Sequence, residues 1–88
     1  MKRRLKKVLV DQDQMMSIRL DEATGDMFAT VLCGGIAMYG VHVQIPEEEK
    51  HRIEDDGYRD WLGAKVRKQR DQIKDRIVEL NASEIEDY

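Results

Sequence analysis

The sequence predicts an α+β domain, in which a small antiparallel β-meander of three or four strands is followed by one or two helices packed on one of its faces. Three observations lead to this prediction. The first half of the chain contains short runs in which apolar and polar residues alternate. A Gly-Gly pair at positions 34–35 divides a long uncharged stretch. From position 58 onward, apolar residues recur instead at spacings of three and four, which is typical of a helix.

The composition is that of one small globular domain. The chain has 88 residues, 38% of them charged, and a formal net charge of −3. A domain of this size buries only about 60–65% of its unfolded surface, so we expect modest stability. The acidic balance does not favour a protein built around nucleic acid. We divide the single domain 1–88 into a basic arm at 1–7, a meander at 8–45, a helical part at 46–81 and an acidic tail at 82–88 that we expect to be frayed.

The first strands are predicted from alternation. In "MMSIRL" the apolar residues Met16, Ile18 and Leu20 alternate with polar ones, which predicts a half-buried strand. The segment "DEATGD" that follows has the glycine and aspartate content of a turn. Upstream, "KVLV" is a weaker candidate for an additional strand, and "DQDQ" would connect it to the next one; whether residues 5–10 form a strand stays open.

The uncharged stretch Met27–Ile45 is just long enough to be considered as a membrane span, which needs about 20 apolar residues. Its glycines argue against a helix, because each weakens a helix by about 1 kcal/mol relative to alanine. A two-residue period follows the Gly-Gly pair, and a two-residue hairpin turn uses glycine at positive φ. We therefore predict two adjacent antiparallel strands, Met27–Cys33 and Ile36–Ile45, and no membrane span.

The helical part begins at Pro46, which is followed by Glu47, Glu48 and Glu49. Proline suits a first helical position, and carboxylates in the first turn complement the positive end of the helix dipole. The alternative is that this acidic cluster binds a metal ion or a basic partner. Three adjacent glutamates on a helix point in three directions, so we favour the structural interpretation.

The C-terminal segment from Tyr58 to Leu80 is rich in helix-forming residues. Residues spaced by three and four form one narrow, mainly apolar stripe along this segment, which would suit packing across a small sheet. The stripe residues are Leu62, Val66, Gln69, Ile73, Ile77 and Leu80. The polar Gln69 interrupts this stripe.

Trp61 does not belong to that stripe. At about 100° per residue it points about 140° away from Val66 and lies close to Lys65 and Lys68. In one interpretation the Pro46–Asp56 helix folds back at Gly57 and covers the tryptophan. In the other, Tyr58, Trp61, Lys65 and Lys68 are partly exposed and have the composition of a partner-binding hot spot.

The same helix offers a second candidate surface. Lys65, Arg67, Lys68 and Arg70 give it a basic face, and Lys2–Lys7 could act as a basic arm. These residues would serve a nucleic-acid-binding domain, although nearby acidic residues dilute the patch.

The sequence lacks the recognisable motifs of an enzyme. It has no phosphate-binding loop, no Cys/His cluster with zinc spacing and no Ser-His-Asp grouping, so we expect no catalytic residues, no cofactor and no metal. The single Cys33 excludes an internal disulfide and is predicted to be a small buried apolar residue. Neither His42 nor His51 has a partner at ligand spacing. With no signal peptide recognisable, we expect a cytoplasmic protein.

From these observations we expect a small non-catalytic protein–protein interaction module, of inhibitor, immunity, antitoxin or regulatory-subunit type. It would bind a protein partner through an edge strand, through the Tyr58–Trp61–Lys65 surface, or through both. The edge would be the first strand or Met27–Cys33, and such an edge would also suit a homodimer. The alternatives are the nucleic-acid-binding domain and a structural homo-oligomer. The sequence does not identify the partner.

Overall fold

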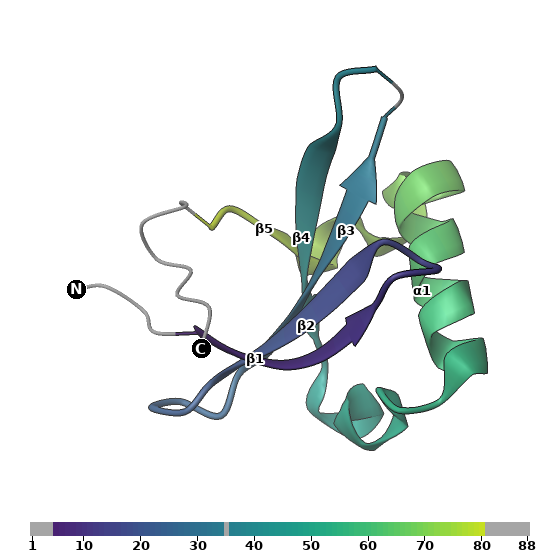
Figure 1. The fold of residues 1–88 in the computed structure, drawn as a ribbon. Helices are drawn as coiled ribbons and strands as arrows, with labels where there is room; N and C mark the ends of the chain where they lie inside the picture. Colours follow the sequence, from purple (N-terminus) through teal and green to yellow (C-terminus); the bar gives the residue numbers. More distant parts are fainter. Residues whose placement is uncertain (1–4, 35, 81–88) are drawn as a thin grey trace.

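The computed structural model describes residues 5–34 and 36–80 and confirms the predicted α+β class. Five strands form one antiparallel sheet in the order β1-β2-β3-β4-β5, a meander in which sequence neighbours pair (Figure 1). Helices lie between the fourth and fifth strands. The elements are β1 (Leu5–Asp11), β2 (Met16–Asp21), β3 (Met27–Cys33), β4 (Tyr39–Ile45), the 3₁₀ helix η1 (Glu47–Arg52), α1 (Asp56–Lys68), the 3₁₀ helix η2 (Arg70–Arg76) and β5 (Ile77–Val78).

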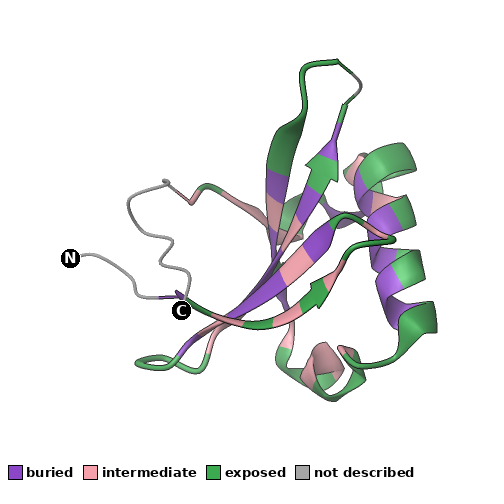
Figure 2. Cartoon of the chain, viewed as in Figure 1, coloured by how far each residue is buried: buried purple, intermediate pink, exposed green. Residues whose placement is uncertain are grey.

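The core lies between α1 and one face of the sheet. Alternation along the strands places apolar side chains there: Ile18 of β2 lies opposite Ala29 of β3, which lies opposite Val43 of β4, and all three are fully buried. The helix covers them with residues spaced four apart, so that they share one side of α1 (Figure 2). These helix residues are Tyr58, Leu62 and Val66.

The uncharged stretch folds back on itself as predicted, and β3 pairs with β4 in antiparallel register. The turn is longer than the predicted two residues, because β4 begins at Tyr39 and not at Ile36. Gly34 takes a positive φ of 94°. Any Cβ there would lie 2.8 Å from the carbonyl oxygen of Ala37, so only glycine fits the start of this loop. No helix in residues 5–34 and 36–80 is long and apolar enough to cross a membrane.

The first strand is longer than predicted. It begins at Leu5, so residues 5–7 belong to the sheet and not to the basic arm, whose remaining residues lie outside the described ones. It lies at an edge of the sheet, as one of the two alternatives predicted. The other alternative is wrong, because β3 lies between β2 and β4. A shift in register between Lys7 and Leu9 leaves Val8 at an irregularity in this edge strand.

The helical part differs from the prediction at both ends. The segment after Pro46 is a short 3₁₀ helix and not an α-helix. The main helix starts at Asp56, and the side chain of Asp55 caps it by accepting a 2.8 Å hydrogen bond from the Gly57 N–H.

The predicted helix over residues 58–80 breaks at Gln69, whose φ and ψ of −134° and 43° are not helical. A straight helix of that length would extend about 34 Å at about 1.5 Å per residue. The seven-residue strands β3 and β4 cover only about 23 Å at about 3.3 Å per residue. The chain therefore turns back through η2, which buries Ile73 and brings Ile77 beside Val43 as the start of β5. The predicted acidic tail lies outside the described residues.

Candidate functional site

Trp61 is the most exposed aromatic side chain of α1, with 41% of its surface accessible, and it lies outside the core stripe as predicted. Its ring stacks on that of Tyr58, with ring centroids 5.9 Å apart and an angle of 29° between the planes. Tyr58 itself is only 1% exposed. An aromatic ring held against a buried one is a fixed contact area that loses little conformational freedom on binding.

Two cations flank the Trp61 ring. The Lys65 Nζ lies 5.9 Å from its centroid and the Arg76 guanidinium carbon 5.7 Å from it, both within the range of cation–π attraction. Lys65 also donates a hydrogen bond to the Gln72 side chain, which holds it near the ring. We call Trp61, Lys65 and Arg76, with Tyr58 beneath them, the Trp61 surface.

The Glu49 carboxylate holds two residues of this surface, Arg76 and Tyr58, in place. It accepts two hydrogen bonds from Arg76, at 2.8 and 2.9 Å, and one from the Tyr58 hydroxyl, at 2.9 Å. Burial raises the pKa of Glu49, but the hydrogen bonds from Arg76 and Tyr58 outweigh it and lower the pKa overall. The pKa of Tyr58 is raised by burial and by Glu49, so its hydroxyl stays a donor. One carboxylate thus connects η1, α1 and η2.

The two interpretations of Trp61 each describe part of what is found. The segment after Pro46 does fold back, but it covers Tyr58, over whose ring Arg52 lies at 5.2 Å. Trp61 stays accessible, as the interface interpretation requires. Tyr58 does not, so the predicted set of Tyr58, Trp61, Lys65 and Lys68 loses its first member. Of the other three, Trp61 and Lys68 are exposed and Lys65 is half-buried.

The basic set predicted for nucleic acid is only partly available. The Arg67 guanidinium donates to the backbone oxygens of Leu32 and Gln14. Arg70 donates to the Val66 carbonyl at 3.0 Å and lies over the Tyr39 ring. Two of the four predicted phosphate contacts therefore already hold the fold together.

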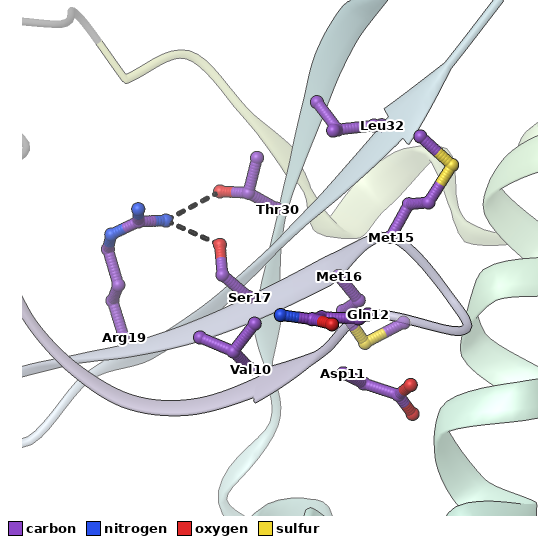
Figure 3. Close-up of a pocket in the computed structure, with 9 residues that line it drawn as sticks. All are labelled: Val10, Asp11, Gln12, Met15, Met16, Ser17, Arg19, Thr30 and Leu32. Carbon is purple, nitrogen blue, oxygen red and sulfur yellow. Dashed lines mark hydrogen bonds between the residues drawn. The ribbon is translucent and has the colours of Figure 1, made fainter.

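A second candidate lies on the sheet face opposite α1, where an open hollow of about 470 Å³ adjoins β1 (Figure 3). We call it the sheet hollow. Apolar side chains form its rim, and the polar side chains of Ser17, Arg19 and Thr30 lie beside them. Arg19 donates hydrogen bonds to Ser17 Oγ at 2.8 Å and to Thr30 Oγ1 at 3.4 Å. The lining residues are Val10, Asp11, Gln12, Met15, Met16, Ser17, Arg19, Thr30 and Leu32.

The polar row continues across the sheet from Thr30 to His42, whose Nδ1 lies 2.8 Å from Thr30 Oγ1. Burial, together with the positive charge of Arg19, lowers the pKa of His42. We therefore expect a neutral imidazole there at neutral pH.

Sequence reasoning did not find the sheet hollow. A signal exists in β1, where Val8, Leu9 and Val10 are consecutive apolar residues. Successive side chains of a strand point to opposite faces, so such a run must leave apolar surface outside the core. Only the fold shows that Met15 and Leu32 lie beside Val10.

Two glutamates of the acidic cluster after Pro46 have partners within the fold. Glu47 pairs with Lys50 at 2.5 Å, and Glu49 accepts the hydrogen bonds from Arg76 and Tyr58 described above. No group of three or more potential metal ligands is found among the described residues. Cys33 is buried on the core face, as predicted, with its Sγ 3.7 Å from the Val31 carbonyl oxygen.

Comparison of the chain with protein-family models, with curated proteins and with solved structures finds no match to any of them. The function must therefore be argued from the surfaces described above.

Proposed function

We propose that this chain is a small non-catalytic protein-interaction module whose protein partner docks on the Trp61 surface. One observation carries the proposal: Trp61 is held in a fixed orientation by Tyr58, Lys65 and Arg76 while 41% of it stays exposed. Tryptophan, tyrosine and arginine are the residues most enriched where binding energy concentrates in protein interfaces. An inhibitor, an immunity or antitoxin protein, or a regulatory subunit would use such a surface.

The charges around Trp61 indicate the kind of partner. Lys65 and Arg76 flank the ring and Lys68 lies exposed on the same helix, while the carboxylate of Glu49 is already occupied. A partner with acidic residues around an apolar pocket would complement this surface. The proposal also places the chain in a reducing compartment, the cytoplasm, because nothing in the fold depends on oxidation of Cys33.

Affinity capture with matched variants tests the proposal. Immobilised wild-type protein, Trp61→Ala and Tyr39→Ala are each exposed to lysate of the native host, and the retained proteins are identified by mass spectrometry. Tyr39 is the control, because it is a half-exposed aromatic residue with an arginine over its ring, but on β4. We expect a partner that wild type and Tyr39→Ala retain and Trp61→Ala loses.

A second variant separates binding from folding. Lys65→Glu keeps the core intact and reverses one charge beside Trp61, so it should weaken capture at least about 10-fold with little change in melting temperature. Unchanged capture by both Trp61→Ala and Lys65→Glu would show that the partner docks elsewhere. Retention of nucleic acid that is lost on raising the salt concentration would instead favour the basic surface of Lys65, Arg67, Lys68 and Arg70.

A further inference from the structure

We propose that the outer edge of β1 and the sheet hollow beside it bind an extended segment of a protein partner, which adds a strand to the sheet and places a bulky apolar side chain in the hollow. The inference rests on the proposed function only in that both require the partner to be a protein. The surface is a different one, on the sheet face opposite α1.

The edge of β1 is suited to strand addition. It is seven residues long, and within residues 5–34 and 36–80 only β2 pairs with it. The opposite edge is formed by β5, which has two residues. An edge strand presents a row of backbone donors and acceptors to a partner strand. Val8 and Val10 on β1 are both exposed, so an added strand would also cover apolar side chains.

The sheet hollow lies at the C-terminal half of this edge. Val10, Ser17 and Thr30 lie side by side on β1, β2 and β3, so the hollow extends from the edge strand inward across the open face. Its apolar rim is accessible: Val10 is 53%, Met15 42% and Leu32 39% exposed (Figure 3). In strand addition the backbone supplies affinity, and pockets for alternate side chains supply specificity. The hollow is placed where such a pocket would be.

Met15 supports a binding role for this hollow. It has a positive φ of 52°, a conformation that costs an L-residue about 1–2 kcal/mol. Strained backbone of this kind concentrates at functional sites. The methionine side chain is flexible and polarisable, and it can adjust to ligands of different shape.

The basic charge on β1 favours a partner segment that carries an acidic residue. In the N-terminal half of β1, Lys6 forms a long, exposed ion pair with Glu22 at 3.8 Å. Pairs of this kind contribute little to stability, so a partner can replace them. A segment running antiparallel to β1 would therefore place its apolar residue beside Val10 and then an acidic residue beside Lys6.

A second copy of this chain does not fit the edge. Its β1 would have to supply the acidic residue, and Asp11 is the only acid in that strand. The Asp11 carboxylate accepts a 2.7 Å hydrogen bond from Arg59 of α1 and another from the Gln14 N–H. The Asp11 side chain therefore lies on the core side of the sheet and cannot pair with Lys6 of a second copy.

Selection of short random-sequence peptides displayed on phage, against the whole protein, tests the inference. We expect enriched peptides in which a large apolar residue precedes an acidic one, with Kd values tighter than about 1 mM. Amide chemical-shift changes on adding a synthetic peptide of the enriched sequence should map to Val8, Val10, Met15 and Leu32. Leu32→Ser should weaken this binding about 10-fold, and Trp61→Ala should leave it unchanged.

Other results would overturn the inference. These are the enrichment of no peptide, shifts confined to α1, or equal binding by Leu32→Ser and wild type. Light scattering adds a further outcome. If the wild-type protein is a dimer and Val10→Lys converts it to a monomer, the edge of β1 and the sheet hollow bind a second copy of this chain and not a peptide segment of another protein. Because Trp61→Ala is a control here, failure of this inference leaves the test of the Trp61 surface unaffected.

Discussion

Met15 adopts a backbone conformation that methionine rarely takes. It is the one non-glycine residue with positive φ among the described residues, and it closes the turn between β1 and β2. Asparagine tolerates this conformation better than methionine does. We expect Met15→Asn to raise the free energy of unfolding by about 0.5–1 kcal/mol, which corresponds to a rise of several degrees in melting temperature. Urea denaturation measures the first quantity directly.

Met15→Leu is the matched control, since leucine keeps the volume and the same backbone strain. It should leave stability within about 0.5 kcal/mol of wild type. Equal stability of the asparagine and leucine variants would show that the backbone at position 15 is not strained. If the sheet hollow binds a peptide, Met15→Asn should also weaken that binding, so stability and affinity would change in opposite directions.

Tyr58 and Trp61 show how far sequence reasoning reaches for single residues. The angular position of Trp61 relative to Val66 correctly places its ring outside the core stripe. The same spacing could have placed Tyr58, since it lies four residues before Leu62 and eight before Val66 and therefore shares their face. The hot-spot interpretation instead groups Tyr58 with Trp61 on a partly exposed surface, and the carboxylate that accepts its hydroxyl hydrogen bond, Glu49, belongs to another element.

The β3–β4 hairpin depends on Gly34, and two glycines allow a matched experiment. Gly34 and Gly25 have similar positive φ values, 94° and 80°. A Cβ at Gly25 would meet nothing within 4 Å, whereas one at Gly34 would lie 2.8 Å from the Ala37 backbone oxygen. Gly25→Ala should therefore cost about 1–2 kcal/mol for the backbone conformation alone, and Gly34→Ala should cost more. Chemical denaturation of both variants gives the comparison, and an equal loss would contradict the steric argument.

At the level of elements, alternation predicted the strands well because their inner faces all meet one core. It predicted β2 over Met16–Asp21 and β3 over Met27–Cys33 almost residue for residue. The continuous helix over residues 58–80 failed for a reason that is not local. Its apolar spacing is real, but the sheet is too short to cover it, so Ile73 and Ile77 reach the core only after a break at Gln69.

At the level of the whole molecule, the sheet hollow could not be predicted from any one segment. It exists because no helix of residues 5–34 and 36–80 covers this face (Figure 1) and because residues from β1, the following turn and β3 meet there. The Trp61 surface is similar, since Arg76 reaches the ring only after η2 folds back. A sequence pattern can indicate which residues leave the core, but the neighbours that turn them into a site depend on the tertiary fold.

Two partly buried carboxylates link the helices to each other and to the sheet, and they make stability depend on pH. Hydrogen bonding from Arg59 lowers the pKa of Asp11 below its ordinary 3.8. Hydrogen bonding from Arg76 and Tyr58 outweighs burial and lowers the pKa of Glu49 below its ordinary 4.5. A carboxyl group with a lowered folded-state pKa stabilises the fold above its unfolded-state pKa, and this contribution disappears as pH falls through the folded-state value. Burial and Arg19 also lower the pKa of His42 below its ordinary 6.5, so the stabilising contribution of its neutral imidazole begins to disappear below about pH 7. We therefore expect stability to be constant only above about pH 7, to decline first as His42 is protonated, and to fall further below about pH 5 as the carboxylates are protonated.

Asp11→Asn tests this dependence. The free energy of unfolding of this variant should be about 1–3 kcal/mol lower near neutral pH, because the buried Arg59 side chain of α1 then loses its charged partner on β1. Its stability should decline less than that of wild type between about pH 6 and about pH 3, because one of the two carboxylates no longer titrates. Asp13→Asn, at an exposed position in the neighbouring turn, is the control and should follow the wild-type curve. Parallel pH curves for wild type and Asp11→Asn, measured by urea denaturation, would show that the Asp11–Arg59 pair does not link α1 to the edge of the sheet.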